Sequence, residues 1–251
     1  ESFRFKKLDE EIELITIASK YADIAIEYLK DNAKELINQN IDERTLVKIC
    51  TEFSKTEMLN ELSSAFDETP CNVVATIHSG PRGAFPHGKS LSRVPQKNET
   101  LICGVGACVG GLYAESGITF ILGEPNKDQE NIIKAMKEVN DVAVENLKEG
   151  NICEEVNNAT SEVYREYNLT KYVRHRIGHG MGFEGHEAPW LSPGDKTVLK
   201  ENMVFSNEPG VYRPNIDGYR TISSMIVGKS SGKQIPNFLD KSIDNRIINL
   251  N

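Results

Sequence analysis

The segment ADIAIEYLKDN at residues 22–32 returns in altered form as NDVAVENLKEG at residues 140–150. Five aligned positions are identical, and two more exchange isoleucine for valine. Apolar residues recur in both copies at helical spacing. Each copy is followed by a second helical segment and then by strand-like sequence, so the order helix, helix, strands occurs twice. The repeat predicts an α+β fold of two similar halves, each with helices outside a strongly curved antiparallel sheet.

The apolar and turn-forming residues set the expected elements. Helical spacing predicts helices at residues 8–37, from residue 42, at 126–150 and at 153–168. β-branched, glycine-bounded runs predict strands at residues 72–78 and 100–123, the latter a pair joined by a glycine turn. We expect the polar tail, residues 229–251, to wrap the surface. A cleft between the two halves is the expected place for a small-molecule site.

The composition restricts the class of protein and its partners. The 251 residues carry a net charge of −8, which argues against a nucleic-acid-binding surface. No apolar stretch reaches the length of a transmembrane helix, so no membrane association is expected. The five cysteines are scattered and never form a CxxC pair, which favours free thiols in a reducing, cytoplasmic setting.

Three of the five histidines lie in RHRIGHGMGFEGHE at residues 174–187. The glycines between them exclude a regular helix and let the backbone approach a ligand. In a strand, His175 and His179 would share one face because their separation is even. Clustered imidazoles serve as metal ligands or as acid–base groups near neutral pH, and the residues alone leave both roles open. His78, outside this segment, is expected to be a structural hydrogen-bonding residue.

Two longer stretches of the sequence resemble a known protein family. IGHGMGFEGHEAP at residues 177–189 and ENMVFSNEPGVYRPNIDGYR at residues 201–220 resemble the end of the catalytic domain shared by prolidase, aminopeptidase P and creatinase. The resemblance extends over residues 8–29, 78–94 and 107–125 and covers nearly the whole chain. It implies the pita-bread fold, a pseudo-two-fold duplication around a curved antiparallel sheet, which agrees with the repeat.

The resemblance also implies a metal centre, which this chain has altered. Prolidase-like members of the family hold two divalent ions with two aspartates, one histidine and two glutamates. The histidine corresponds to His179, the first glutamate to Glu208 and the second aspartate to Glu115. The family's spacing places the first aspartate at Gly104 and the last glutamate at Ile222. Two ligands are therefore missing and a third is longer by a methylene, which predicts a degenerate dinuclear site.

A set of substrate-handling residues follows from the same resemblance. The expected catalytic histidines are His87, His175 and His186. The residues expected to bind substrate are Glu115, Glu208, Tyr212 and Arg220. If one ion is retained, the resemblance leaves Glu115, His179 and Glu208 to hold it.

Three functions remain open at this point. The leading hypothesis is a hydrolase of the creatinase and prolidase type that cleaves a C–N bond without metal, acting on a small cationic or peptide-like substrate. In it His87 transfers the proton, and Glu115 and Glu208 bind a guanidinium or amine. The second is a residual Xaa-Pro dipeptidase or aminopeptidase with one manganese, cobalt or zinc ion. The third is an inactive peptide- or protein-binding module.

The expected organisation is a single pita-bread domain over residues 1–251. Members of the family often carry a separate N-terminal domain, which we expect to be absent or removed here. No cofactor is expected, apart from one divalent ion under the second hypothesis. The expected partners are a short peptide or small molecule and a second copy of the chain in a homodimer.

Overall fold

The computed structural model describes residues 2–235 and 241–250. Its helices are α1 (Asp9–Asn38), α2 (Glu43–Leu62), the short α3 (Ser64–Glu68), α4 (Lys127–Asn146) and α5 (Cys153–Glu166). The strands of the first half are β1 (Asn72–Ser79), β2 (Thr100–Val109) and β3 (Leu112–Leu122). The later strands are β4 (Gly178–Gly180), β5 (Glu187–Leu191), β6 (Val204–Asn207), β7 (Gly210–Arg213), β8 (Asp217–Arg220), β9 (Ile222–Ile226), β10 (Lys233–Ile235) and β11 (Ile247–Ile248). None of the described helices is long and apolar enough to span a membrane.

The two helices that carry the repeat begin with similar N-terminal capping hydrogen bonds. In α1, the Glu11 carboxylate accepts a hydrogen bond from the backbone N–H of Leu8 at 2.7 Å. In α4, Asn126 accepts from the N–H of Gln129, and the Gln129 side chain accepts from the N–H of Asn126. Both arrangements satisfy backbone donors that the first turn of a helix leaves free. Residues within the first turn therefore specify where each helix begins, independently of its tertiary contacts.

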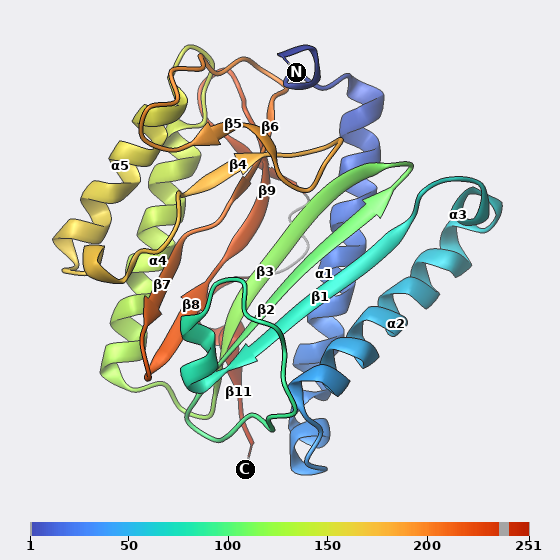
Figure 1. The fold of residues 1–251 in the computed structure, drawn as a ribbon, viewed down its shortest axis with the longest axis vertical. Helices are drawn as coiled ribbons and strands as arrows, with labels where there is room; N and C mark the ends of the chain where they lie inside the picture. The colour runs from blue at the N-terminus through green and yellow to red at the C-terminus, as the bar shows by residue number, and fades with distance from the viewer. Residues whose placement is uncertain (1, 236–240, 251) are drawn as a thin grey trace.

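Within the described residues, nine strands form one large sheet, whose central path is β1-β2-β3-β9-β6-β4-β5. Figure 1 shows α1 and α2 beside β1–β3, and α4 and α5 beside the strands of the second half. The β2–β3 hairpin turns at Gly110 and Gly111, both with positive φ, as a two-residue hairpin turn requires. The halves join where β3 pairs antiparallel with β9, through Ser116 opposite Ser223 and Gly117 opposite Ile222.

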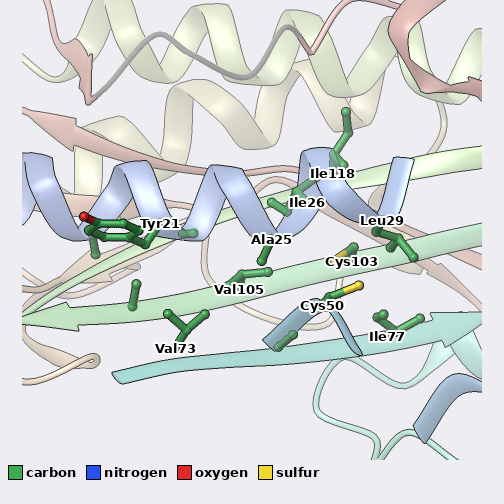
Figure 2. Close-up of a cluster of buried hydrophobic side chains, with 14 of the residues drawn as sticks. Tyr21, Ala25, Ile26, Leu29, Cys50, Val73, Ile77, Cys103, Val105 and Ile118 are labelled. Carbon is green, nitrogen blue, oxygen red and sulfur yellow. The ribbon is translucent and has the colours of Figure 1, made fainter. Parts of the chain in front are cut away.

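The core of the first half lies between α1, α2 and the sheet. Figure 2 shows Ala25 and Leu29 of α1 close to Val105 and Cys103 of β2, with Cys50 of α2 nearby. A second apolar cluster lies in the other half, between α4, α5 and its strands. Each half thus buries one face of its strands under its own helices and leaves the opposite face for the site.

The α+β pita-bread expectation is confirmed by this arrangement and by the solved structures described below. Two details differ from the prediction. The short helix α3 was not expected. The tail does more than wrap the surface, because β10 extends the sheet from β9 and β11 pairs in parallel with β3. Residues 236–240 and 251 of that tail lie outside the described residues.

Candidate functional site

Glu115, His179 and Glu208 meet at the junction of the two halves. Nε2 of His179 lies 2.8 Å from Oε1 of Glu208 and 3.8 Å from Oε2 of Glu115. The His179 side chain is 2% exposed, and those of the two glutamates are 15% and 11% exposed. Three candidate ligands far apart in the chain therefore converge, as the resemblance implied.

The backbone brings them together because strand β4 packs very closely against its neighbours. A Cβ on Gly178 would lie 2.0 Å from the carbonyl oxygen of Ser206, and one on Gly180 would lie 2.6 Å from that of Ala188. Only glycine fits at these positions, so His179 is the one residue of β4 with a side chain. The sequence Gly-His-Gly thus allows close packing of the strands and leaves the imidazole of His179 as the single side chain of β4.

The two carboxylates have opposite electrostatic environments. Burial and the nearby charge of Glu208 raise the pKa of Glu115 to about 7, although His179 and a hydrogen bond from Ser206 act against this. Burial would also raise the pKa of Glu208, but the contact with His179 and the charge of Arg220 outweigh it and lower the value to about 2. Burial opposes the charged form of His179, yet Glu208 and Glu115 raise its pKa. An imidazolium–carboxylate pair between His179 and Glu208 is the favoured state.

His186 and His87 complete a row of imidazoles. The rings of His179 and His186 are stacked with centroids 4.0 Å apart, and the His87 ring lies edge-on to that of His186 at 6.2 Å. The rings of His87 and His186 are both exposed to solvent. Burial and the charge of His179 lower the pKa of His186, so its neutral form is favoured. The row connects the buried imidazole to solvent.

His175 differs from its expected position. It lies in a bend before β4, which begins at Gly178, so the prediction that His175 and His179 share one strand face was wrong. Its Nδ1 donates to the carbonyl of Arg176 at 2.7 Å, which leaves Nε2 to accept from the hydroxyl of Tyr212 at 2.8 Å. Burial lowers its pKa. Tyr212 is itself buried and reaches the site through this contact.

The two positions where the resemblance implied further ligands, Gly104 and Ile222, lie next to each other and beside Arg220. Ile222 lies in a hollow formed by Gly104 and Gly117, because a Cβ on those glycines would be 3.2 Å and 2.7 Å from its Cδ1. A Cβ on Gly104 would also lie 2.9 Å from Nη2 of Arg220. The substitutions are therefore matched to one another in shape.

A cleft of about 330 Å³ opens over these residues. Its lining includes His87, Gly104, Glu115, His186, Glu208, Arg220 and Ile222. A smaller cavity, lined by His87, His175, Arg176, His179, His186 and Glu208, adjoins it. Every predicted site residue except Tyr212 thus borders one of these two spaces.

The donor set does not fit the two-ion cluster of the family. Gly104 and Ile222 supply no ligand atom, and Ile222 occupies the space between the two glycines. A single ion fits better. Glu115, His179 and His186 offer ligand atoms that all lie within 4.8 Å of one another. Nδ1 of His179 is held by the carbonyl of Gly180, and its Nε2 is buried without an aligned hydrogen bond, although Glu208 is close. That is how a metal-binding histidine is commonly held.

Reasoning from the sequence missed several neighbours of the site. Ser206 donates to Oε2 of Glu115 at 3.0 Å, and its even separation from Glu208 along the strand was an available signal. His186 was expected to act only on substrate, but it belongs to the three-residue group that could hold an ion. The guanidinium of Arg176 lies 4.1 Å from the ring centre of Trp190, and no pattern in the sequence indicated this pair.

The chain matches the model of metallopeptidase family M24 over residues 13–229. It belongs to that family. It is 32% identical over 232 residues to the Xaa-Pro dipeptidase of Pyrococcus furiosus, an alignment that covers 92% of this chain and 63% of the relative. The chain thus spans a little under two thirds of the length of this curated relative.

Solved structures of similar proteins have the same fold. The prolidase from Pyrococcus furiosus superposes with a TM-score of 0.80 at 29% identity, covering 95% of this chain and 67% of that one. The Xaa-Pro dipeptidase from Bacillus anthracis gives a TM-score of 0.83 at 26% identity, covering 100% and 65%. The resemblance inferred from the sequence is confirmed.

Proposed function

We propose that this M24 chain hydrolyses a C–N bond in a small peptide-like substrate without the two-ion cluster of its family. The observation that carries the proposal is the packing of Ile222 between Gly104 and Gly117, with Arg220 beside it. Gly104 and Ile222 stand at the two positions where the resemblance implies carboxylate ligands. The histidines and the remaining carboxylates are retained around the cleft, so the proton-transfer part of the site survives.

The reaction needs one water and the movement of protons. The oxygen of water bonds to the carbonyl carbon, the C–N bond breaks, and the leaving nitrogen takes a proton. His87 and His186 are the imidazoles that face the cleft and solvent, and we assign them this proton transfer. His175 is held through both ring nitrogens, so we assign it to positioning, together with Tyr212.

The buried pair of His179 and Glu208 gives the centre a fixed charge distribution. We assign its imidazolium to the stabilisation of the negative charge that develops on the substrate carbonyl oxygen. Glu115, which Ser206 holds, faces the same cleft and is placed to bind a positively charged amine of the substrate. We therefore keep the expected substrate-binding role for Glu115 and Glu208.

A second candidate is a peptidase with one divalent ion. It is favoured by the buried Nε2 of His179, which has no aligned hydrogen bond, and by the nearby ligand atoms of Glu115 and His186. Manganese, cobalt or zinc bound there would polarise the substrate carbonyl. The same three side chains would hold it, with Glu208 adjacent.

Hydrolysis with and without a chelator separates these candidates. Purified protein is assayed for manganese, cobalt and zinc by elemental analysis, and then for cleavage of Xaa-Pro dipeptides. The leading proposal expects cleavage that persists in chelator and is lost in His87→Ala but not in Lys89→Ala, an exposed control on the same loop.

Other outcomes select the alternatives. About one tightly bound ion per chain, lost in His179→Ala together with activity, would replace the leading proposal by the one-ion peptidase. Absence of both metal and turnover over a broad dipeptide panel would reject both, and would leave the peptide-binding module.

A further inference from the structure

His78 is a buried histidine that the proposed reaction does not use. It is 1% exposed and lies near the end of β1, on the cleft face of that strand, because its separation from the cleft-lining Thr76 is even. Nε2 of its ring forms a hydrogen bond with the carbonyl oxygen of Gly88, which directly follows His87 in the chain. A buried side chain of the sheet therefore contacts the residue next to an exposed imidazole of the site.

The direction of this hydrogen bond follows from the groups that form it. A carbonyl oxygen only accepts, so Nε2 of His78 carries the hydrogen and donates to Gly88. Burial lowers the pKa of His78 by more than the hydrogen bond to Gly88 raises it. The neutral ring has a single N–H, and it is used in this contact. His78 is therefore a hydrogen-bond donor to the loop that follows β1.

The residue on the other side of His87 is held in a similar way. Nη1 of Arg220 donates to the carbonyl of Pro86 at 2.8 Å. Arg220 is itself 6% exposed, and both its N–H and its carbonyl bond to the hydroxyl of Thr119. His87 thus lies between two peptide carbonyls, each of which is bound to a buried side chain of a strand.

The loop that carries His87, residues 80–90, is closed at its base by one buried carboxylate. Glu43 of α2 is 0% exposed. Its Oε1 accepts from the N–H and the hydroxyl of Ser79, at 2.8 Å and 2.7 Å, and its Oε2 accepts from the N–H of Leu91 at 3.0 Å. Because both ends of the loop are tied to the same group, the contacts beside His87 act on a backbone whose course is already restricted.

The His87 ring depends on this backbone for its position. In the part of the chain that the structure describes, neither ring nitrogen of His87 forms a hydrogen bond, and the ring lies edge-on to that of His186 with centroids 6.2 Å apart. Groups that transfer protons must be held by packing and hydrogen bonds around them, and a displacement of about 1 Å can cost on the order of a hundredfold in rate. The contacts that fix the neighbouring peptides are therefore relevant to the reaction.

We propose that His78 is a positioning residue, which holds His87 beside His186 through the carbonyl of Gly88. This assignment deepens the proposed function and rests on it for the role of His87 in proton transfer. Arg220 makes the corresponding contact on the other side, but it also lines the cleft, so its replacement would alter substrate binding as well. His78 lines neither of the two spaces described above, and positioning can therefore be tested there separately.

The position of the His87 ring can be measured by NMR without turnover. The chain has five histidines, so the signals of isotope-labelled imidazoles can be resolved, and those of His87 and His186 are assigned by their loss in His87→Gln and His186→Gln. The wild type should show a nuclear Overhauser effect between these two rings. His78→Leu should lose it, whereas His78→Gln, which keeps an N–H donor near the place of Nε2, should retain it. An effect that persists in His78→Leu would overturn the proposal.

A matched control and a second variant keep the comparison decisive. Ser54→Ala removes another buried donor to a backbone carbonyl, that of Tyr21, and should retain the effect between the rings. If His78→Leu does not fold, His78→Asn takes its place, because its amide is too short to reach Gly88. Equal loss in the glutamine variant would assign the effect to packing and reject the hydrogen bond as its cause.

Kinetics separate this proposal from the proposed function. If dipeptides are cleaved, His78→Leu should lower kcat about ten- to hundredfold and change KM by less than about threefold, and His78→Gln should recover most of the loss. Loss of the effect between the rings in a protein that cleaves no dipeptide keeps the positioning contact and rejects the hydrolase. Cleavage with an unchanged kcat in His78→Leu, and with the effect retained, has the opposite meaning.

Discussion

Replacing Glu115 by glutamine should stabilise the protein at alkaline pH. The Glu115 side chain is 15% exposed, and Ser206 donates to its Oε2. Burial and the charge of Glu208 raise its pKa from 4.5 to about 7. Glutamine has the same shape and still accepts from Ser206, but it carries no charge. The variant therefore removes the cost of ionising a buried carboxyl and little else.

The sign and size of the effect follow from the two pKa values. In the unfolded chain, Glu115 releases its proton near pH 4.5, while the folded protein retains it up to about pH 7. The free energy of unfolding therefore falls as the pH rises between these values and is constant above them. The difference corresponds to roughly 3 kcal/mol at pH 8, as an upper value, because each pKa unit is worth about 1.4 kcal/mol. No difference is expected at pH 4.

Urea-induced unfolding at pH 4 and pH 8 measures this. Glu115→Gln should match the wild type at pH 4 and exceed it at pH 8, in the presence of a chelator. Glu13→Gln, an exposed glutamate of α1, serves as the control and should show no pH-dependent difference. A wild-type protein that is equally or more stable than Glu115→Gln at pH 8 would refute the reasoning, because the carboxylate would then be stabilised by a positive partner.

Three further changes probe the packing and charge of the site and its surroundings. Gly117→Ala should lower the free energy of unfolding by about 1–3 kcal/mol through overlap with Ile222, and urea titration should show less than additive loss when it is combined with Ile222→Ala. Lys7→Met should cost roughly 1–3 kcal/mol, because Glu187 loses its buried partner at 2.9 Å and keeps only the more exposed Arg4 at 3.1 Å. In a double-mutant cycle, adding Glu187→Gln should recover part of this loss, and strict additivity would contradict the ion pair. Gly104→Asp with Ile222→Glu should raise the manganese bound per chain in elemental analysis, and unchanged stoichiometry would show that restoring these carboxylates does not rebuild the cluster.

Much of the fold could be predicted because its signals are local and repeated. The two helices with matching sequence, the glycine pair of the β2–β3 hairpin and the alternation of strands all act within short segments. The tail could not be predicted in the same way. Strand β11 pairs with β3, more than a hundred residues earlier, and a two-residue strand has no periodic pattern to reveal it.

The residues of the candidate site could be predicted from the sequence, but their arrangement in space could not. Glu115, His179 and Glu208 were identified by resemblance, and they do converge. The stacking of His186 on His179 depends on how the loop after β4 returns, which spacing alone does not specify. The position of Arg220 opposite Gly104 depends on strands from both halves of the chain.

The altered residues also form a consistent charge balance. The resemblance implies four carboxylates around two divalent ions in the family, and this chain keeps only Glu115 and Glu208. Both carboxyl groups line the cleft together with Arg220, and the imidazole of His179, whose pKa their charges raise, lines the adjoining cavity. Above pH 7, where Glu115 is ionised, the two carboxylates balance the guanidinium and the protonated imidazole, and the cluster is close to neutral with protein groups alone.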